Sequence, residues 1–496
     1  MSVLEAPLIV ASNRGPVTFE PDESGELRPQ RGSGGLVTAL TGATQSTEGL
    51  WVAAAMSDGD REVAAAAGDG RVDVDTESGT FNVRFVVIPP DVYDRYYNWI
   101  ANGILWFAHH YLWDTVRSPV FGEDSDRAWD DYVEVNREFA QALAEEGARQ
   151  SRTPVYLVQD YQLAVVPRLL RELVPDALIA HFSHTPIAGP TYLRILPTRM
   201  RDELLAGMLG ADVLGFHSEA WAENFLMSAR SLPGTRVDLA RSRVVFEGRE
   251  ILVRVHPISV EAEPMRALAA TPRLRRLRRE LGRWRGDAKL IVRVDRLELT
   301  KNVVRGFKAF EVLLARHPEW IGQVKFLALL SPSRQVLPEY RAYTKECLAE
   351  AERINHTFEG GGWEPVRVRV KEDHARAVAA YGLYDVLLVN PVFDGMNLVA
   401  MEGPLVNRRH GVLVLSRNAG AYGRLGRYAI GINPFDVRET ADAIHEALTM
   451  PQHERVRRAR GLSRLVLANP LSRWVRSQLE DLERVRQRLA RRAQVS

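Results

Sequence analysis

Three observations predict an α/β fold built from doubly wound sheets. Short apolar runs rich in Val, Ile and Leu recur along the 496-residue chain, and each ends in polar residues, Gly or Pro. Amphipathic helical patterns lie between these runs. A strand that is apolar on both faces is typical of a parallel sheet with helices on both sides. The alternation of strand and helix over this length therefore indicates a doubly wound architecture.

The apolar runs and the periodic stretches give the expected elements in chain order. The expected strands are Leu8–Ser12, Val155–Gln159, Leu178–Phe182, Val213–Phe216, Leu290–Val294, Val324–Leu330, Val386–Val389, Val412–Leu415 and Ile430–Ile432. The expected helices are Trp129–Glu146, Leu163–Leu173, Val303–Ala315, Pro338–Asn355, Arg438–Met450 and Leu471–Arg492. The last of these is rich in Arg and Glu, which predicts a packing helix with a solvated charged face.

The pattern runs in two blocks, which predicts two Rossmann-like domains. The second block begins at Lys289–Arg296, after an Arg-rich helical stretch, and the linker is expected near Pro257–Pro264. We expect residues 1–258 to form the first domain and residues 259–470 the second, with the C-terminal helix within 471–496 packing back on the first. Ligands of such domains bind at the carboxyl ends of the strands, so we expect a cleft between the two domains.

The charge balance argues against a protein that coats polyanions. Lys and Arg total 65 and Asp and Glu total 63, which leaves a net charge of +2. A general nucleic-acid binder is strongly basic, so we expect no nucleic-acid partner. Nearly all of the positive charge is arginine. Codon bias accounts for this, yet a lysine within a motif stands out, because the chain has only six: Lys289, Lys301, Lys308, Lys325, Lys345 and Lys371.

Cysteine usage and the N-terminal segment bear on the compartment. The single cysteine, Cys347, allows no intramolecular disulfide and no Cys-based zinc site, and no other pattern indicates a metal site. The N-terminus lacks the basic and apolar regions of a signal peptide, and no stretch of 18 apolar residues occurs. We expect a cytoplasmic protein with no membrane partner. The sequence leaves open whether the protein forms a homo-oligomer.

In the first half, two segments lie near the first predicted strand and its following helix. Asn13-Arg14 closes that strand, and the Gly-rich stretch Arg31–Leu36 then opens a helix, where backbone N–H groups can approach an anion. A flexible loop without a ligand fits this stretch equally well. Tyr97 and Trp106 lie further on, where they can stack on a sugar or form part of an aromatic core.

Two further polar residues end neighbouring strands of the first block. Asp160 follows the strand that ends at Gln159, and His184 follows the strand that ends at Phe182. A carboxylate and an imidazole at these positions would face the cleft, where they can form hydrogen bonds or handle protons.

The second half holds two segments that suit a phosphorylated ligand. Arg296 and Lys301 lie just past a strand and before a helix, where two cations can neutralise a diphosphate leaving group. A solvated surface pair is the alternative. In Asn390–Glu402 a strand runs into a Gly turn and a helix start, whose backbone N–H groups can point at phosphate. Asp394 and Glu402 there can hold sugar hydroxyls, although a capped helix start without a ligand also fits.

Together these segments resemble the trehalose-6-phosphate synthase family of retaining nucleotide-sugar glycosyltransferases. The resemblance runs from Ile9 to about Glu454, and it includes the stretches Leu209–Phe216, Asn224–Leu226, Leu415–Ala421 and Asn433–Asp436. It implies the GT-B architecture, in which two Rossmann-like domains flank a cleft. It also implies transfer of glucose from UDP- or GDP-glucose to glucose 6-phosphate, which gives α,α-trehalose 6-phosphate. The partners are then small molecules, and no metal or other cofactor is needed, because the nucleotide sugar is a co-substrate.

The resemblance assigns roles to individual residues. Those matched to the acceptor phosphate are Arg14, Tyr97, Trp106 and Arg334. Those matched to the nucleotide-sugar donor are Gly35, Arg296, Lys301, Asp394, Met396, Asn397, Leu398, Val399 and Glu402. Those expected to act in catalysis are Asp160, His184, Arg296, Lys301 and Asp394. Trp51 matches a tryptophan of the family's cleft.

Four positions depart from the family pattern. The family has His where this chain has Gln159 and Gln162, Arg where it has Phe393, and Lys where it has Met401. These departures bear on the substrate rather than on the reaction class. Two alternatives follow: a relative that uses a cyclitol phosphate or glycerol phosphate as acceptor, and a catalytically weak homologue that binds sugar phosphates as a regulator.

Overall fold

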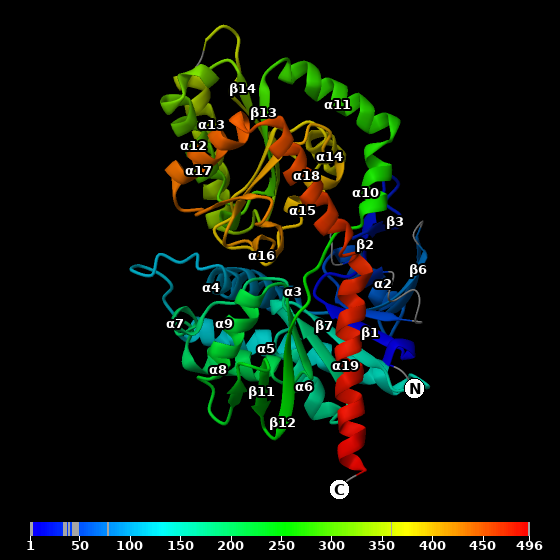
Figure 1. Cartoon of the computed structure of the whole chain (residues 1–496). Helices are drawn as coiled ribbons and strands as arrows, with labels where there is room; N and C mark the ends of the chain where they lie inside the picture. Colours follow the sequence, from blue (N-terminus) through cyan, green and yellow to red (C-terminus); the bar gives the residue numbers. More distant parts are fainter. Residues whose placement is uncertain are drawn as a thin grey trace. The chain divides into compact units, whose positions relative to one another are not determined.

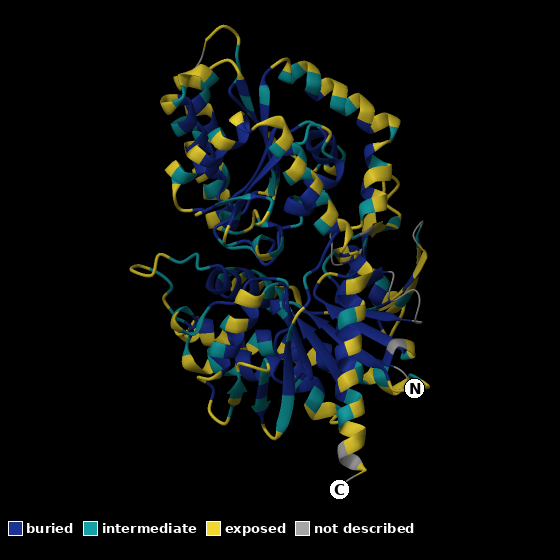
Figure 2. Ribbon diagram, in the orientation of Figure 1, coloured by how far each residue is buried: buried dark blue, intermediate teal, exposed yellow. Residues whose placement is uncertain are grey.

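The computed structural model of the chain describes residues 3–32, 37, 40, 41, 49–76, 79–358 and 360–494 (Figure 1). Its strands assemble into two main sheets, and helices alternate with strands along most of the sequence. The central strands of both sheets are dark blue in Figure 2, because these strands are buried while the covering helices keep one exposed face. The α/β class predicted from the apolar runs is confirmed.

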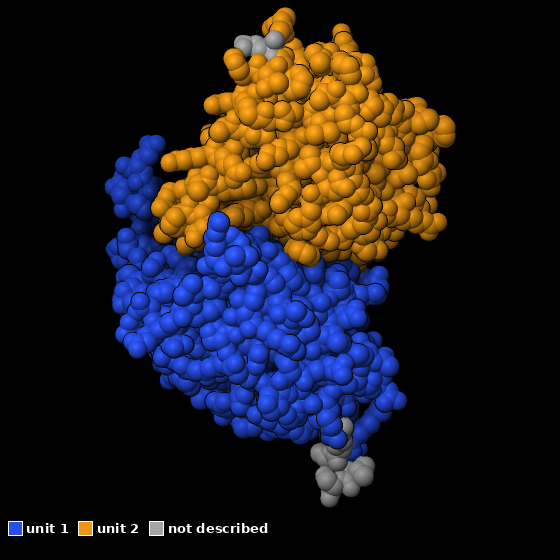
Figure 3. Space-filling model, turned by 90° about the vertical axis from the view of Figure 1, so that its left-hand side faces the viewer, with its two compact units in different colours: residues 1–258, 471–496 blue, residues 259–470 orange. Residues whose placement is uncertain are grey.

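The chain divides into two compact units, coloured blue and orange in Figure 3. The first unit comprises residues 1–258 together with residues 471–496. The second comprises residues 259–470. Each unit contains one of the two main sheets, so each buries a core of its own.

The first unit is built on a ten-stranded sheet in the order β10-β11-β12-β9-β8-β7-β1-β4-β6-β5. Its strands are β1 (Leu8–Ser12), β4 (Leu50–Ala54), β5 (Arg71–Thr76), β6 (Gly79–Val86), β7 (Val155–Gln159), β8 (Leu178–Phe182), β9 (Val213–Phe216), β10 (Arg236–Asp238), β11 (Arg243–Phe246) and β12 (Arg249–Val255). A separate antiparallel hairpin consists of β2 (Val17–Pro21) and β3 (Leu27–Arg31).

The edges of this sheet differ from the expected all-parallel arrangement. Its centre, from β12 to β6, is parallel, but β5 pairs antiparallel with β6, and β10, β11 and β12 form an antiparallel meander. The physical reason is visible in β5, whose sequence Arg-Val-Asp-Val-Asp-Thr alternates polar and apolar residues. Such a strand keeps one face in water, which an antiparallel edge permits and a helix-covered parallel strand does not.

Helices cover the first sheet, and the chain's last helix belongs to them. They are η1 (Val3–Glu5), α2 (Asp58–Ala66), α3 (Pro90–Tyr93), the π-helical η2 (Asp94–Leu105), α4 (Trp106–His109), α5 (Glu123–Ala148), η3 (Tyr161–Leu163), α6 (Val166–Leu173), α7 (Pro190–Leu193), α8 (Thr198–Met208), α9 (Glu219–Ala229) and α19 (Leu471–Ala493). Helix α19 packs against η1, β8 and β9. Its Asp481 lies 3.1 Å from His256, and its Glu483 accepts a hydrogen bond from the backbone N–H of Val3.

The second unit is built on a six-stranded sheet that is parallel throughout, in the order β15-β14-β13-β16-β17-β18. Its strands are β13 (Lys289–Arg296), β14 (Val324–Ser331), β15 (Val366–Val370), β16 (Val386–Val389), β17 (Val412–Ser416) and β18 (Ile430–Ile432). Its helices are α10 (Ala262–Ala269), α11 (Pro272–Arg285), η4 (Leu299–Lys301), α12 (Val303–Arg316), η5 (Pro318–Trp320), α13 (Pro338–Thr357), α14 (His374–Tyr381), α15 (Val399–Val406), α16 (Tyr422–Leu425), α17 (Val437–Thr449) and α18 (Gln452–Leu467).

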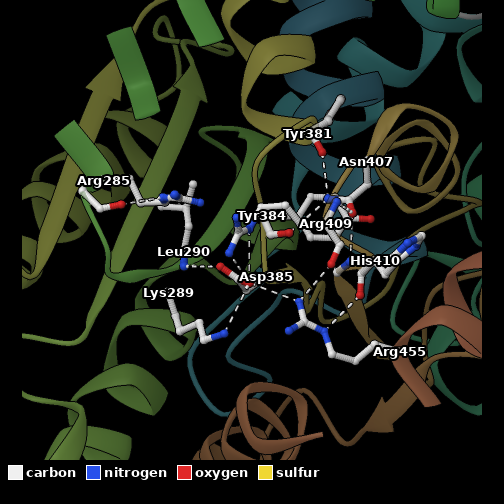
Figure 4. Close-up of polar contacts among 12 residues, drawn as sticks. Arg285, Lys289, Leu290, Tyr381, Tyr384, Asp385, Asn407, Arg409, His410 and Arg455 are labelled. Carbon is white, nitrogen blue, oxygen red and sulfur yellow. Dashed lines mark hydrogen bonds and ion pairs between the residues drawn. The ribbon is translucent and has the colours of Figure 1, made fainter. Parts of the chain in front are cut away.

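A buried carboxylate joins several elements at the amino end of this sheet (Figure 4). Asp385 immediately precedes β16, and its Oδ2 accepts a hydrogen bond from the backbone N–H of Leu290 in β13. Its Oδ1 accepts from Arg409 at 3.2 Å and from Arg455 of α18 at 3.1 Å. A buried charge is tolerated when it is paired in this way, so Asp385 ties two strands and a helix together.

No helix within the described residues is both long enough and apolar enough to cross a membrane.

Candidate active site

Polar residues follow three neighbouring strands of the first unit. Strands β1, β7 and β8 run parallel side by side, so the segments after them meet at the carboxyl edge of the sheet. Asp160 follows β7 with a left-handed backbone, φ 70°. Its carboxylate accepts a hydrogen bond of 3.0 Å from the backbone N–H of His184, which follows β8. The structure thus brings together the two residues predicted to act in catalysis from this unit.

The imidazole of His184 is held by polar and aromatic neighbours. Its Nε2 lies 3.0 Å from Oε1 of Gln159, which is fully buried. Its ring packs against Phe182, against His217 and against Trp474 of α19. Burial lowers the pKa of His184 well below its usual value, and the neighbouring His217 lowers it further. The imidazole is therefore neutral near pH 7, where Nε2–H donates to Gln159 and Nδ1 keeps its lone pair.

The end of β1 is tied to a cluster of tyrosines. Asn13 accepts a hydrogen bond from the hydroxyl of Tyr96 at 3.0 Å and donates one to the hydroxyl of Tyr93 at 3.1 Å. The ring of Tyr97 stacks on that of Tyr93, with centroids 5.3 Å apart. Arg14 follows Asn13 and is exposed. Asn13 therefore fixes the strand end that carries Arg14 beside the helix that carries Tyr97.

The remaining positions assigned to this unit have different environments. Trp106 is buried and its ring stacks on His110, with centroids 4.0 Å apart. Trp51 is a core residue of β4 that donates its indole N–H to Ser12 at 2.8 Å, so the expectation that it lines a cleft is wrong. Apolar strands such as β4 fill both of their faces with core side chains. Gly35 lies outside the described residues.

In the second unit, the predicted donor residues gather at the carboxyl edge of the sheet. Lys301 ends the turn η4 after β13, and its Nζ forms an ion pair with Oδ2 of Asp394, which follows β16. Asn397 donates to the same oxygen at 3.1 Å. Strands β13 and β16 are neighbours, which explains how residues 93 positions apart come together.

A buried arginine supports the turn that carries Lys301. Arg293 is fully buried and forms an ion pair with Asp295 at 2.8 Å. Its guanidinium also donates to the backbone carbonyls of Lys301 at 2.8 Å and Val303 at 3.3 Å. These bonds fix the backbone of the turn, and the fixed backbone in turn restricts the position of the Lys301 ammonium group.

Helix α15 begins beside this ion pair. The side chain of Asn397, a residue with φ 74°, accepts a hydrogen bond from the backbone N–H of Ala400 and so caps the helix start. Glu402 lies in the first turn of α15 and accepts a hydrogen bond of 3.0 Å from Tyr381. Burial raises the pKa of Glu402. The other donor positions, Met396, Leu398 and Val399, lie in the same segment, with Met396 buried and the latter two half-buried.

Arg334 lies after β14, next to β13 in the same sheet. It has a left-handed backbone, φ 43°, and Nη1 donates to the hydroxyl of Tyr340 at 2.9 Å. The same nitrogen lies 3.5 Å from the carboxylate of Glu298. Glu298 also forms an ion pair of 3.2 Å with Arg296. The structure thus brings a cation assigned to the acceptor and a cation assigned to the donor to one carboxylate.

Two of the departures from the family pattern replace charge with apolar packing. Met401 is buried within α15, so this position presents no charge to a ligand. Phe393 precedes Asp394, and its ring lies 6.4 Å from that of Phe435. Arg305 lies over the Phe435 ring at 5.4 Å. The wall beside Asp394 is therefore more aromatic than the family pattern implies.

One group of side chains in the described parts of the chain has metal-ligand chemistry: His317, Glu319 and His445. The imidazoles of His317 and His445 stack face to face, 3.6 Å apart and 12° from parallel. Imidazole lone pairs lie in the ring plane, so two parallel stacked rings cannot direct them at one ion. Nδ1 of His445 also accepts a hydrogen bond from Trp320. This group does not fit a metal, and the absence of a metal or other cofactor at the donor site stays a prediction.

Comparison with known proteins decides the family. The sequence profile of glycosyltransferase family 20 matches residues 6–484. The chain belongs to glycosyltransferase family 20. It is therefore a glycosyltransferase of the trehalose-phosphate synthase family, as the motifs predicted.

Relatives within the family carry two kinds of name. The chain is 33% identical over 480 residues to the validamine 7-phosphate valienyltransferase of Streptomyces hygroscopicus subsp. jinggangensis, covering 96% of this chain and 94% of that protein. It is 33% identical over 491 residues to the trehalose-6-phosphate synthase of Mycobacterium marinum, covering 96% and 94%.

Solved structures of the family share the fold. A structure described as trehalose-6-phosphate from E. coli bound with UDP-2-fluoro glucose matches with a TM-score of 0.83 and 29% identity, over 96% of this chain and 99% of that one. The α,α-trehalose 6-phosphate synthase of Burkholderia multivorans matches with a TM-score of 0.84 and 29% identity, over 98% of both chains. The predicted GT-B fold is confirmed.

Several residues that build the site were not singled out from the sequence. Glu298 and Arg293 lie within a segment that drew attention through Arg296 and Lys301, and an acidic residue between two cations was the available signal. Tyr381 and Trp474 had no local signal. Each contacts its partner, Glu402 or His184, only through the tertiary fold.

Proposed function

We propose that this family 20 enzyme transfers glucose, with retention of configuration, from a nucleoside diphosphate glucose to glucose 6-phosphate. The product is α,α-trehalose 6-phosphate. One observation carries the proposal: Arg296, Lys301, Asp394 and the start of α15 gather at the carboxyl edge of one parallel sheet. Two cations and a helix N-terminus suit a diphosphate, and the acidic group beside them suits a sugar hydroxyl.

In the proposed reaction the leaving diphosphate stays on the face that the acceptor attacks. A diphosphate oxygen takes the proton of the acceptor hydroxyl, so no carboxylate nucleophile is required. Arg296, Lys301 and the backbone N–H groups at the start of α15 stabilise the negative charge that develops on the leaving group. These groups supply the positive charge that a metal would otherwise provide, so we propose that the reaction needs no cofactor.

The first unit is assigned to the acceptor and to the sugar. Arg14, with Tyr97 and Trp106, and Arg334 of the second unit would bind the acceptor phosphate, which orients the attacking hydroxyl. The neutral His184 would form a hydrogen bond with a sugar hydroxyl through Nδ1, because Nε2–H is engaged by Gln159. The carboxylate of Asp160 accepts a hydrogen bond from the backbone N–H of His184, and a carboxylate at this position suits a hydroxyl of the transferred ring.

A second candidate is transfer to another phosphorylated acceptor, such as a cyclitol phosphate. The specific observation is that His184 is held by Gln159, where the family pattern has a histidine, and that a relative of 33% identity is named a valienyltransferase. The apolar Met401 and the aromatic Phe393 are further departures from the family pattern, and they bear on the identity of the substrate.

The test is a matrix of donors and acceptors with the purified protein. UDP-glucose and GDP-glucose are each combined with glucose 6-phosphate, glycerol phosphate, validamine 7-phosphate or no acceptor, and nucleoside diphosphate release is measured. Release that depends on glucose 6-phosphate supports the first proposal, and NMR of the product then gives the anomeric configuration. Release only with another phosphorylated acceptor supports the second candidate. No release in any combination contradicts both.

The charge role of Lys301 is tested in the same assay. Lys301→Ala should lower kcat by about 100-fold or more, the size expected for one electrostatic group at a developing oxyanion. Lys308→Ala is the matched control, because Lys308 is exposed on α12 seven residues later. Equal activity of the two variants would remove Lys301 from the proposed mechanism.

A further inference from the structure

The carboxylate of Glu298 contacts both Arg296, which is assigned to the donor phosphate, and Arg334, which is assigned to the acceptor phosphate. Glu298 follows β13, and its backbone N–H donates to the carbonyl of Arg296 at 2.8 Å. Its own carbonyl accepts from the backbone N–H of Lys301 at 3.0 Å, which starts the turn η4. The side chain points inward and is completely buried. An uncompensated charge at such a position would be strongly destabilising, so its partners matter.

The partners of Glu298 converge on a single oxygen. Oε1 accepts a hydrogen bond from Ser333 at 2.7 Å, and it lies 3.2 Å from Nη1 of Arg296 and 3.5 Å from Nη1 of Arg334. The other oxygen, Oε2, is buried and has no hydrogen-bond partner within the described parts of the chain. A buried acceptor without a partner costs stability, which a purely structural carboxylate would avoid.

The two guanidinium groups differ in how firmly the protein holds them. The side chain of Arg296 is 53% exposed, and Glu298 is its one anionic partner among the described residues. The side chain of Arg334 is 13% exposed and is held from the other side by Tyr340. Without the carboxylate, Arg296 would sample many rotamers in water. The anchored N–H leaves the remaining N–H groups of Arg296 available to a ligand in a fixed orientation.

The ionisation state of Glu298 also fits a role in holding the two arginines. Burial alone would raise the pKa of Glu298, but Arg296, Arg334 and Lys301 outweigh it and lower the pKa to about 2. The carboxylate is therefore ionised at any pH at which the protein is used. Its negative charge also opposes nearby phosphates, so its value to the enzyme must lie in geometry rather than in attraction for the substrates.

We propose that Glu298 is a positioning residue that holds the donor-phosphate cation Arg296 and the acceptor-phosphate cation Arg334 at a fixed separation through one shared carboxylate. The inference deepens the proposed function and rests on it for the roles of the two arginines. Oε2 lets either guanidinium keep a contact with the carboxylate when a phosphate draws it away from Oε1. Both substrate phosphates are then oriented relative to the same carboxylate. Such an effect raises kcat by stabilising the transition state more than it lowers the KM of either substrate.

The test is the kinetics of Glu298→Gln and Glu298→Asp with donor and acceptor varied in turn. Glu298→Gln keeps the volume and an acceptor for Ser333 but removes the charge that holds both arginines. We expect kcat to fall by at least about tenfold, while the KM for each substrate stays within about threefold or decreases, because lost order slows the reaction and lost negative charge favours anion binding. Glu298→Asp keeps the charge and should recover most of kcat.

Glu311→Gln is the matched control, because Glu311 also pairs with an arginine, Arg353, but on the surface of the second unit. It should leave kcat and both KM values unchanged. Circular dichroism and thermal unfolding show whether each variant is folded. A folded Glu298→Gln protein with kcat within twofold of the parent, or with a change confined to the KM of one substrate, would overturn the proposal.

Failure of the proposed function gives a different result. If the parent protein transfers nothing between the substrates of the matrix, the function is wrong, and the anchor is tested by calorimetric binding of inorganic pyrophosphate and of glucose 6-phosphate. A shared anchor predicts that Glu298→Gln changes the binding enthalpy of both probes. If the binding enthalpy of neither probe changes, the proposal is overturned independently of activity.

Discussion

At the scale of single residues, His184 shows how the fold decides protonation. Imidazole is the side chain whose ordinary pKa lies closest to neutrality, yet here burial among Phe182, His217 and Trp474 lowers the pKa of His184 well below that value. The sequence alone predicted a group that forms hydrogen bonds or handles protons. The structure favours the first role, because a neutral imidazole with Nε2–H on Gln159 can only accept at Nδ1.

This argument predicts the titration of His184. In protein labelled with ¹⁵N-histidine, the His184 resonances should report a neutral ring with the proton on Nε2 between about pH 6 and 8, whereas an exposed histidine titrates near 6.5. His184→Gln identifies the signal. A protonation midpoint for His184 within that pH range would contradict the lowering of its pKa by burial.

The same shift has a consequence for stability. The unfolded chain binds a proton at His184 below about pH 6.5, and the folded chain does not. The unfolded state therefore binds more protons as the pH falls, so the free energy of unfolding decreases from pH 6.5 towards the lowered folded-state pKa. The stability of His184→Gln should depend less on pH over this interval.

At the scale of elements, buried parallel strands were the most predictable part of the fold. All nine strands expected from apolar runs are present, and β1, β7, β8, β9, β16 and β18 have the expected bounds. A strand that is buried on both faces leaves a continuous apolar run, which is easy to read. Some of the missed strands, such as β5 and β10, lie at sheet edges, where alternating polar residues or short length remove that signal. The buried interior strand β4 was missed as well, although its sequence is apolar throughout.

Site residues followed the same logic. Asp160, His184, Lys301 and Asp394 could be proposed because each lies just after a readable strand, and parallel strands end at a common edge. Gln159 was noted only as a departure from the family, and Glu298 was not noted at all. Their roles depend on side chains that meet in space, which strand order predicts only coarsely.

Asp385 gives a prediction at this scale, because it ties β13, β16 and α18 together (Figure 4). Asp385→Asn would leave Arg409 and Arg455 without their carboxylate, and loss of one partner of a buried pair typically costs about 3–5 kcal/mol. Urea unfolding measures this change. Asp385 precedes β16, whereas Asp394 follows it, so the kcat of the folded variant should be unchanged.

The control for this variant is Asp442→Asn, because Asp442 pairs with Arg316 on the surface. An exposed pair contributes about 0–1 kcal/mol. A loss of stability no larger than that of the control would mean that Asp385 does not tie these elements together.

At the scale of the whole molecule, the last helix of the chain packs against a predicted site residue of the first unit. Helix α19 begins after the second unit ends, and its Trp474 packs edge-on against Phe182, with ring centroids 5.0 Å apart. The same indole lies 5.5 Å from the ring of His184. A charged amphipathic tail predicted a packing helix, but its sequence could not indicate that one of its side chains contacts His184, a predicted catalytic residue.

Trp474→Ala should therefore act on stability and on His184 together. Removing a buried indole costs about 3–5 kcal/mol, and water admitted to the space weakens the burial that lowers the pKa of His184. The pKa of His184 should rise towards its ordinary value, so the ring should begin to titrate nearer neutrality and kcat should fall on the acidic side of the pH profile. Arg476→Ala is the control, because Arg476 is exposed on the same helix. If Trp474→Ala lowers stability but leaves the His184 titration unchanged, α19 supports the sheet without tuning the histidine.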